Sequence, residues 1–238
     1  MTMYIGDLSQ RKVAAVAGFV YLAIIILGIF AEFFVRSRMI VPGDALTTAN
    51  NILASEWLFR IGIASDLIML SFDVLVAWAL YVLLKQVNQS LAMLALLFRL
   101  MHAAIYAATL LLLFFVLLML SGANYLAAIE TDQMHALVLL FLHGHSYGYD
   151  LGLLFFGLHC FVLGYLIFNS GYIPKILGVL LISASLVYLA GSFTRFLFPD
   201  YIEIISPIYV VSLIAELSLC LWLLFKAIKF ESLDDAAH

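Results

Sequence analysis

Long runs of apolar residues dominate the chain, and most polar residues lie in the short segments between them. A helix that crosses the hydrocarbon core of a bilayer needs about 20 mainly apolar residues. Six runs reach this length, at about 13–35, 57–84, 91–120, 147–168, 173–197 and 207–225. No linker or internal repeat separates them. The pattern therefore predicts an all-α fold, a polytopic transmembrane helical bundle of six spans that forms a single domain over 1–238.

Two outer loops are predicted to carry short helices of their own. The segment 41–44 contains Pro and Gly and is typical of a turn, and Asp44 can cap a helix over 45–55. The amphipathic pattern of that helix favours a position in the membrane interface. A second interfacial helix is predicted at 131–142, with the chain turning at 143–145 before the fourth span.

Composition supports a membrane protein and excludes other classes. Of the 238 residues, 66% are hydrophobic and 11% are charged, whereas soluble domains have roughly 45–50% and 25%. A soluble enzyme is therefore excluded. The net charge of −4 comes without a run of like charge, so a nucleic-acid partner is not expected. Membrane lipids are the expected surroundings, and the sequence does not indicate an oligomeric state.

The basic residues in the loops predict the orientation, because cytoplasmic loops carry an excess of Lys and Arg. With the amino terminus inside, the cytoplasmic segments hold six basic residues and the opposite segments hold three. The cytoplasmic residues are Arg11, Lys12, Lys85, Lys175, Lys226 and Lys229, and the outer residues are Arg36, Arg38 and Arg195. Both termini are therefore predicted to lie in the cytoplasm, with the first run retained as a span.

Five ionisable side chains are predicted to lie at one depth inside the spans. Each such group costs several kcal/mol or more in lipid unless it is paired or hydrated, so it marks a candidate site. At about 1.5 Å per residue, these five lie roughly 12–17 Å from the inner boundary, near the midplane. The members of this buried polar layer are Asp73, Arg99, His102, His159 and Glu216.

Three hypotheses account for the polar layer. It is a structural network in which Arg99 pairs with a carboxylate, Asp73 being the first choice because its span is adjacent. Alternatively, His102, His159, Asp73 and Glu216 hold a metal ion, or the two histidines hold a haem. Against a metal, the Glu-x-x-His motif is absent and Arg99 would repel a cation. The third hypothesis is a proton or ion relay. No Lys lies at this depth, which excludes a retinal Schiff base.

A second group of polar residues is predicted near the outer boundary, where it would form a polar pocket under the outer loops. Its members are Glu32, Arg36, Asp44, Glu56, Arg60, Asp66, His143, His145 and Asp150. Asp66 and Asp73 are seven residues apart, so one helix face joins this group to the midplane layer. Interfacial salt bridging is the alternative to a pocket.

Small residues on the fourth span predict close helix packing. Gly148 and Gly152 are four residues apart and share a face with His159. Glycines at this spacing let a neighbouring helix approach closely. His159 is therefore predicted to point into the bundle and to contact a polar residue of the second, third or sixth span.

Several sequence blocks carry a resemblance to a known family. They are IFAEFFVR at 29–36 with IVPGD at 40–44, LFRIGIASD at 58–66, and HSYGY at 145–149 continuing to FFGLHC at 155–160 and GY at 164–165. Over about 10–229 the chain resembles a bacterial family of six-helix membrane proteins catalogued as a domain of unknown function. The resemblance implies this topology and a bacterial inner (cytoplasmic) membrane location. It implies no activity, substrate or cofactor.

The expected function is the binding or transport of a small lipophilic ligand, a lipid or a proton by the polar layer and the outer pocket. One alternative is a membrane enzyme in which the same residues hold a metal or haem. Another is an interaction protein whose polar core is purely structural.

Overall fold

The computed structural model describes residues 10–234, with side chains described as far as residue 225. Six helices are long and apolar enough to cross a membrane. The first comprises α1 (Gln10–Ile29), η2 (Phe30–Arg36) and α2 (Ser37–Met39), and the others are α4 (Glu56–Leu84), α5 (Gln89–Met119), α6 (Thr131–Asn169), α7 (Lys175–Leu197) and α9 (Tyr209–Asp234). Residues 10–234 contain no strand. The all-α, six-span prediction is confirmed, and the chain is a multi-pass membrane protein.

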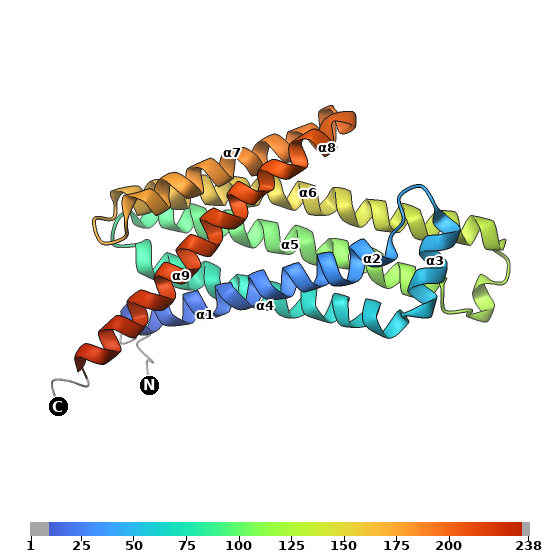
Figure 1. The fold of residues 1–238 in the computed structure, drawn as a ribbon, viewed down its shortest axis with the longest axis horizontal. Helices are drawn as coiled ribbons and strands as arrows, with labels where there is room; N and C mark the ends of the chain where they lie inside the picture. Colours follow the sequence, from blue (N-terminus) through green and yellow to red (C-terminus); the bar gives the residue numbers. More distant parts are fainter. Residues whose placement is uncertain (1–9, 235–238) are drawn as a thin grey trace.

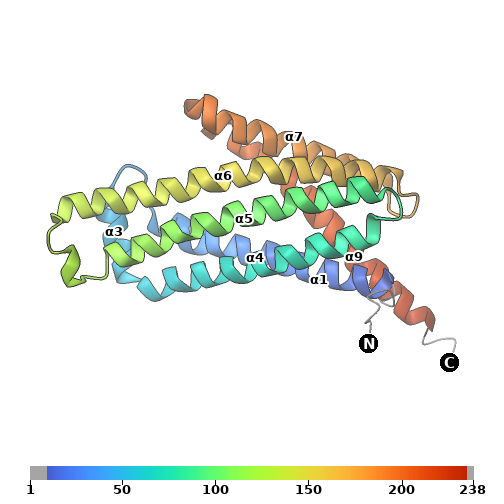
Figure 2. The same ribbon diagram turned by 180° about the vertical axis from the view of Figure 1, so that it is seen from behind.

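The helices form an elongated bundle in which neighbours in sequence pack side by side (Figures 1 and 2). α5 and α6 run along each other, and α7 folds back along α6. α9 crosses the bundle diagonally, from α1 at one end to α7 at the other (Figure 1). The start of α1 and the end of α9 lie at the same end, here called the inner end. Lys226 and Lys229 of the orientation prediction lie beyond the described side chains.

The opposite end of the bundle is here called the outer end. The helix α3 (Ala45–Ala54) lies across this end of the bundle (Figure 1). It begins as predicted, because the Asp44 side chain accepts a hydrogen bond from the Thr47 amide at 2.9 Å. Gly43 adopts the positive φ of 77° that the preceding turn requires. The remaining short elements are η3 (Asn124–Leu126), η4 (Pro199–Tyr201), α8 (Ile202–Ile205) and η5 (Ser206–Ile208).

The prediction of a separate interfacial helix at 131–142 is wrong. α6 runs without interruption from Thr131 to Asn169, through the expected turn at 143–145. A single glycine costs a helix only about 1 kcal/mol relative to Ala. Here a Cβ on Gly144 would lie 3.1 Å from Leu112 Cδ1, so α5 packs closely along the helix at this point. Tertiary packing thus extends α6 beyond the length that a bilayer requires.

Glycines on α6 allow the close packing that the sequence predicts. A Cβ on Gly148 would meet the Thr109 side chain at 2.1 Å, and one on Gly152 would lie 3.1 Å from His102 Nδ1. On the other face, Gly164 of α6 and Gly178 of α7 bring two backbones together. α6 is therefore held between α5 and α7, with His159 between the helices.

Candidate functional site

The centre of the polar layer is an ion pair between α5 and α4. Arg99 donates to Asp73 Oδ1 from both Nε (2.9 Å) and Nη2 (2.6 Å). Arg99 is 1% exposed and Asp73 is 5% exposed, so bulk solvent screens the pair little. The prediction that Asp73 is the partner of Arg99 is confirmed. Removing one member of such a pair strands a charge in the bundle.

His159 of α6 extends this ion pair. It is 1% exposed, its Nδ1 lies 2.8 Å from the Ala95 carbonyl oxygen, and its Nε2 lies 3.3 Å from Arg99 Nη1. With the proton on Nδ1, the imidazole donates to the carbonyl and accepts from the guanidinium. The predictions that His159 is buried and contacts a polar residue of a neighbouring span are confirmed.

Glu216 of α9 joins the layer through tyrosines instead of through Arg99. Tyr21 donates to Glu216 Oε2 at 2.9 Å, and Tyr188 donates to Oε1. The ring of Tyr21 also lies under the Arg99 guanidinium, with Cζ 4.9 Å from the ring centroid. Such cation–π contacts strengthen away from water. Tyr21 therefore connects the carboxylate of Glu216 to the Arg99–Asp73 pair.

A polar cavity of about 90 Å³ lies beside these groups. One buried water needs roughly 10–15 Å³ of such space, so the cavity has room for several. Its lining combines apolar side chains with polar groups from five helices: Asp73 of α4, Arg99 and His102 of α5, Tyr149 of α6, Tyr188 of α7 and Glu216 of α9. The four helices that supply the predicted layer thus meet at one space.

Two atoms of the cavity lining are buried without a hydrogen-bond partner. They are Oδ2 of Asp73 and Nδ1 of His102. The His102 ring packs instead against Phe156, with centroids 5.0 Å apart. An unpartnered buried polar atom costs roughly 1–3 kcal/mol. Two such atoms on one cavity indicate that the cavity accommodates hydrogen-bonding molecules.

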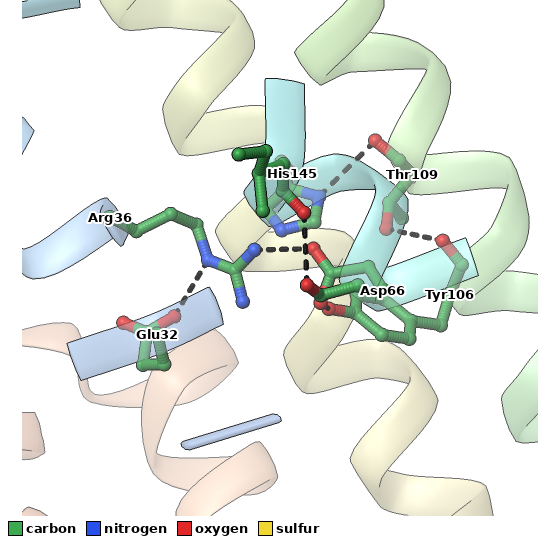
Figure 3. A network of polar contacts seen from close by, with 8 residues as sticks. Glu32, Arg36, Asp66, Tyr106, Thr109 and His145 are labelled. Atoms are coloured by element: carbon green, nitrogen blue, oxygen red, sulfur yellow. Dashed lines mark hydrogen bonds and ion pairs between the residues drawn. The ribbon is translucent and has the colours of Figure 1, made fainter. Parts of the chain in front are cut away.

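A second network lies nearer the outer end (Figure 3). Arg36 donates to Glu32 at 2.8 Å and to Asp66 Oδ2. Tyr106 donates to the other Asp66 oxygen at 2.8 Å. Asp66 is fully buried, whereas the Glu32 side chain is 54% exposed. This chain of contacts therefore runs from the surface into the bundle.

A π-helical segment places Arg36 in this network. η2 is a wider turn in which the Ser37 amide donates to the Glu32 carbonyl oxygen. Such segments are rare and frequent at functional sites. Gly62 of α4 lets η2 approach, because a Cβ there would lie 3.0 Å from Val35. The close approach brings the Arg36 guanidinium to Asp66.

His145 lies at the end of the same network. Its Nδ1 is 3.2 Å from the Thr109 carbonyl oxygen, and its ring packs against Tyr106 with centroids 5.7 Å apart (Figure 3). Of the predicted outer pocket, the structure therefore brings together Glu32, Arg36, Asp66 and His145.

The other predicted members of the outer pocket lie elsewhere. Asp44 caps α3, and hydrogen bonds from Thr47 lower the pKa of its exposed carboxyl. Arg60 pairs with Glu56 in an exposed i,i+4 contact at 2.7 Å. His143 is exposed.

Asp150 belongs to a separate contact between α6 and α7. Arg195 donates to Asp150 Oδ2 at 2.7 Å and to the Ser146 hydroxyl at 3.1 Å. Arg195, which the orientation count assigns to the outer side, lies in the last turn of α7 and pairs across the helix interface. Asp150 is thus a packing residue between helices, outside the Arg36 network.

The geometry does not support the metal hypothesis. Within the residues that the structure describes, no three His, Cys, Asp or Glu side chains converge to hold a metal ion. His159 already uses both ring nitrogens, on Ala95 and on Arg99. A metal or a bis-histidine haem at His102 and His159 would have to break these contacts.

The tyrosines of the site are missing from the sequence prediction. Tyr21, Tyr106 and Tyr188 each donate to a carboxylate inside the bundle, Asp66 for Tyr106 and Glu216 for the other two. Tyrosine is common at membrane interfaces as well as in cores, so the residue type alone does not mark a site. Their position inside apolar runs, at a depth near the acids, is the signal that could have identified them.

The fold and the site define a multi-pass membrane protein with a polar cavity inside its helical bundle. The chain matches the family described as Domain of unknown function (DUF4386) over residues 16–227, and it belongs to that family. It is 35% identical over 129 residues to an uncharacterized protein of Archaeoglobus fulgidus, which covers 54% of this chain and 64% of the relative. The chain thus spans less than two thirds of that relative's length. No solved structure matches the chain.

Proposed function

We propose that this protein binds and releases a proton at Glu216, in the polar cavity, as one step in moving protons or a proton-coupled solute across the membrane. The observation that supports this most directly is the balance of charge around the cavity. Arg99 is permanently charged, and its charge is matched by that of Asp73 at 2.6 Å. Glu216 also lines the cavity, and among the described residues it is bonded by the phenols of Tyr21 and Tyr188 and by no cation.

With both acids ionised, this site would carry one net negative charge inside the membrane. An uncompensated charge there costs several kcal/mol. Binding one proton removes that cost. The cavity size also favours a proton with its waters, because about 90 Å³ is well below the roughly 300–1,000 Å³ of pockets for drug-sized ligands.

Glu216 is a better site for this proton than His102. A proton on His102 would place a second cation beside Arg99, and in the part of the chain that the structure describes Nδ1 of His102 has no hydrogen-bond partner that could stabilise it. A proton on Glu216 yields a neutral acid that still contacts Tyr21 and Tyr188. Asp73 is a weaker candidate because one of its oxygens accepts two bonds from Arg99.

Infrared difference spectroscopy of the purified, reconstituted protein tests this proposal. During a pH titration, the C=O band of a protonated carboxylic acid should appear in the native protein and be absent in Glu216→Gln. The matched control is Glu56→Gln, the same change at an exposed acid, which should keep the band. A native protein without such a band, or a band that only Asp73→Asn removes, would overturn the proposal.

We also propose that the inner end of the bundle faces the cytoplasm of a bacterial cell. The excess of Lys and Arg predicted for that side supports this orientation. Cysteine labelling tests it, because the native Cys160 and Cys220 are buried. In intact spheroplasts, an impermeant thiol reagent should label Asn124→Cys at the outer end and leave Gln86→Cys at the inner end unlabelled. The reverse pattern would contradict the orientation.

A further inference from the structure

We propose that, in the conformation of this structure, Glu216 exchanges its proton with the outer end of the bundle alone, through the phenols of Tyr106 and Tyr149, while apolar packing closes the inner end. This inference rests on the proposed function and adds the route and its direction. The two polar networks described above are the observations that carry it.

The outer network begins at the surface and leads inward. Glu32 is exposed, Arg36 is 7% exposed and Asp66 is fully buried, and each contacts the next. Arg36 keeps its own proton and holds the two carboxylates in place, so water must carry the proton past it. From Asp66 the contact passes to the Tyr106 hydroxyl at 2.8 Å. Asp66 and Asp73 are seven residues apart on α4, which separates the two networks by about 10 Å along the helix.

Tyr149 lies in the interval between the networks. Its ring packs edge-on against Tyr106, with centroids 5.1 Å apart. It lines the cavity together with Glu216. Tyr149 is also 39% exposed, so the cavity wall reaches the bundle surface at this residue. Tyr149 thus contacts Tyr106 of the outer network and lines the cavity that Glu216 also lines.

A phenol can pass a proton on without a net change in its own protonation state. It gives its own proton to an acceptor on one side and takes one from a donor on the other side, and water in the cavity can complete the chain. Charged and titratable groups surround Glu216 on five other helices. They are Tyr21, Asp73, Arg99, His102, Tyr149, Cys160 and Tyr188.

The inner side offers no comparable route among the described residues. From Val76 to Leu84, the buried side chains of α4 are all apolar. The space between His159 and the inner end is lined by residues such as Leu80, Leu163 and Leu166 and measures about 10 Å³. That is at most the room for one water. The structure therefore combines a polar outer side with an apolar inner side.

Time-resolved infrared spectroscopy in proteoliposomes of known orientation tests the route. After a pH step on the outer side, the Glu216 acid band should respond rapidly, and after a step on the inner side it should not. An equal response from both sides would overturn the one-sided access. Absence of the band in the native protein would instead refute the proposed function, so the two failures are distinguishable.

Variants test the role of the phenols. In Tyr149→Phe the amplitude of the Glu216 acid band should equal that of the native protein. The rate at which the band responds should fall by about a hundredfold, which is the lower end of what a positioned proton-transfer group contributes. The matched control is Tyr147→Phe, at an exposed ring two residues away, which should respond at the native rate. Tyr106→Phe, which breaks the contact with Asp66, is a second variant and should also slow the response. Native rates in both Tyr149→Phe and Tyr106→Phe would overturn the inference.

Discussion

Arg99 directs two of its nitrogens at the same oxygen of Asp73, Oδ1, and this leaves Oδ2 buried without a partner. A bidentate pair would have used both oxygens and satisfied both. Here one oxygen neutralises the guanidinium, and the other belongs to a residue of the cavity wall. The pair is therefore both a structural contact between α4 and α5 and part of the candidate site.

Breaking this pair should destabilise the protein. Arg99→Ala strands the Asp73 charge in the bundle, and loss of one partner of a buried pair costs roughly 3–5 kcal/mol. The melting temperature in detergent should fall markedly. The double variant Arg99→Ala/Asp73→Asn should recover part of the loss, because neither charge is then left alone.

The control for this prediction is Arg60→Ala. Arg60 also pairs with a carboxylate, that of Glu56, but the two side chains are 48% and 47% exposed. Exposed pairs contribute little, so the melting temperature should stay close to that of the native protein. A native melting temperature in Arg99→Ala would mean that water neutralises the Asp73 charge in the cavity.

The polar layer could be predicted because helix geometry converts sequence position into depth. Asp73, Arg99 and Glu216 lie on different helices, but each is a similar number of residues from the predicted inner end of its span, and in the structure all of them line one cavity. The hydrogen-bond partners could not be predicted in the same way. Whether Glu216 contacts Arg99 or Tyr21 depends on how the helices rotate and cross, which a single sequence does not reveal.

The outer end was harder to predict, because loop boundaries decide which residues belong to it. The continuous α6 carries His145 on a rigid helix, where a turn was expected. Asp150 lies inside the predicted fourth span, and it pairs with Arg195 of α7 instead of joining the Arg36 network. The π turn that aims Arg36 at Asp66 has no recognisable sequence pattern, since its residues would also suit an ordinary α-helix.

His159 should contribute to stability through its contact with Arg99. His159→Ala removes the acceptor for one guanidinium nitrogen and should cost about 1–3 kcal/mol, the range for an unpaired buried group. His159→Gln keeps both a donor and an acceptor and should lose less. Thermal unfolding measures both, with the exposed His143→Ala as the control. Equal stability of the Ala and Gln variants would contradict this role.

The cap of α3 should be sensitive to acid. Thr47 lowers the pKa of Asp44 below its ordinary value, so the cap stabilises α3 fully above that ordinary value. The contribution should be lost as the pH falls through the lowered pKa. At neutral pH, hydrogen exchange of the α3 amides should speed up in Asp44→Ala and change little in Asp44→Asn, because Asn also caps helices well. Equal exchange in the two variants would rule out this cap.

Two glycines of α6 should differ sharply in their tolerance of a methyl group. In Gly164→Ala the new Cβ would lie 2.7 Å from the Gly178 carbonyl oxygen and 2.9 Å from Ile182 Cγ1. Backbone of α7 cannot move aside cheaply, and overpacking typically costs 1–3 kcal/mol. The melting temperature should therefore fall.

Gly144→Ala is the matched change on the same helix, at the place where the sequence predicts a turn. Its Cβ would lie 3.1 Å from Leu112 Cδ1, the end of a flexible side chain that can shift. Because α6 is continuous here, Ala should gain up to about 1 kcal/mol of helix propensity over Gly. The melting temperature should stay the same or rise. A clear loss of stability in Gly144→Ala, as large as that in Gly164→Ala, would mean that the chain does not pass through residues 143–145 as a regular helix.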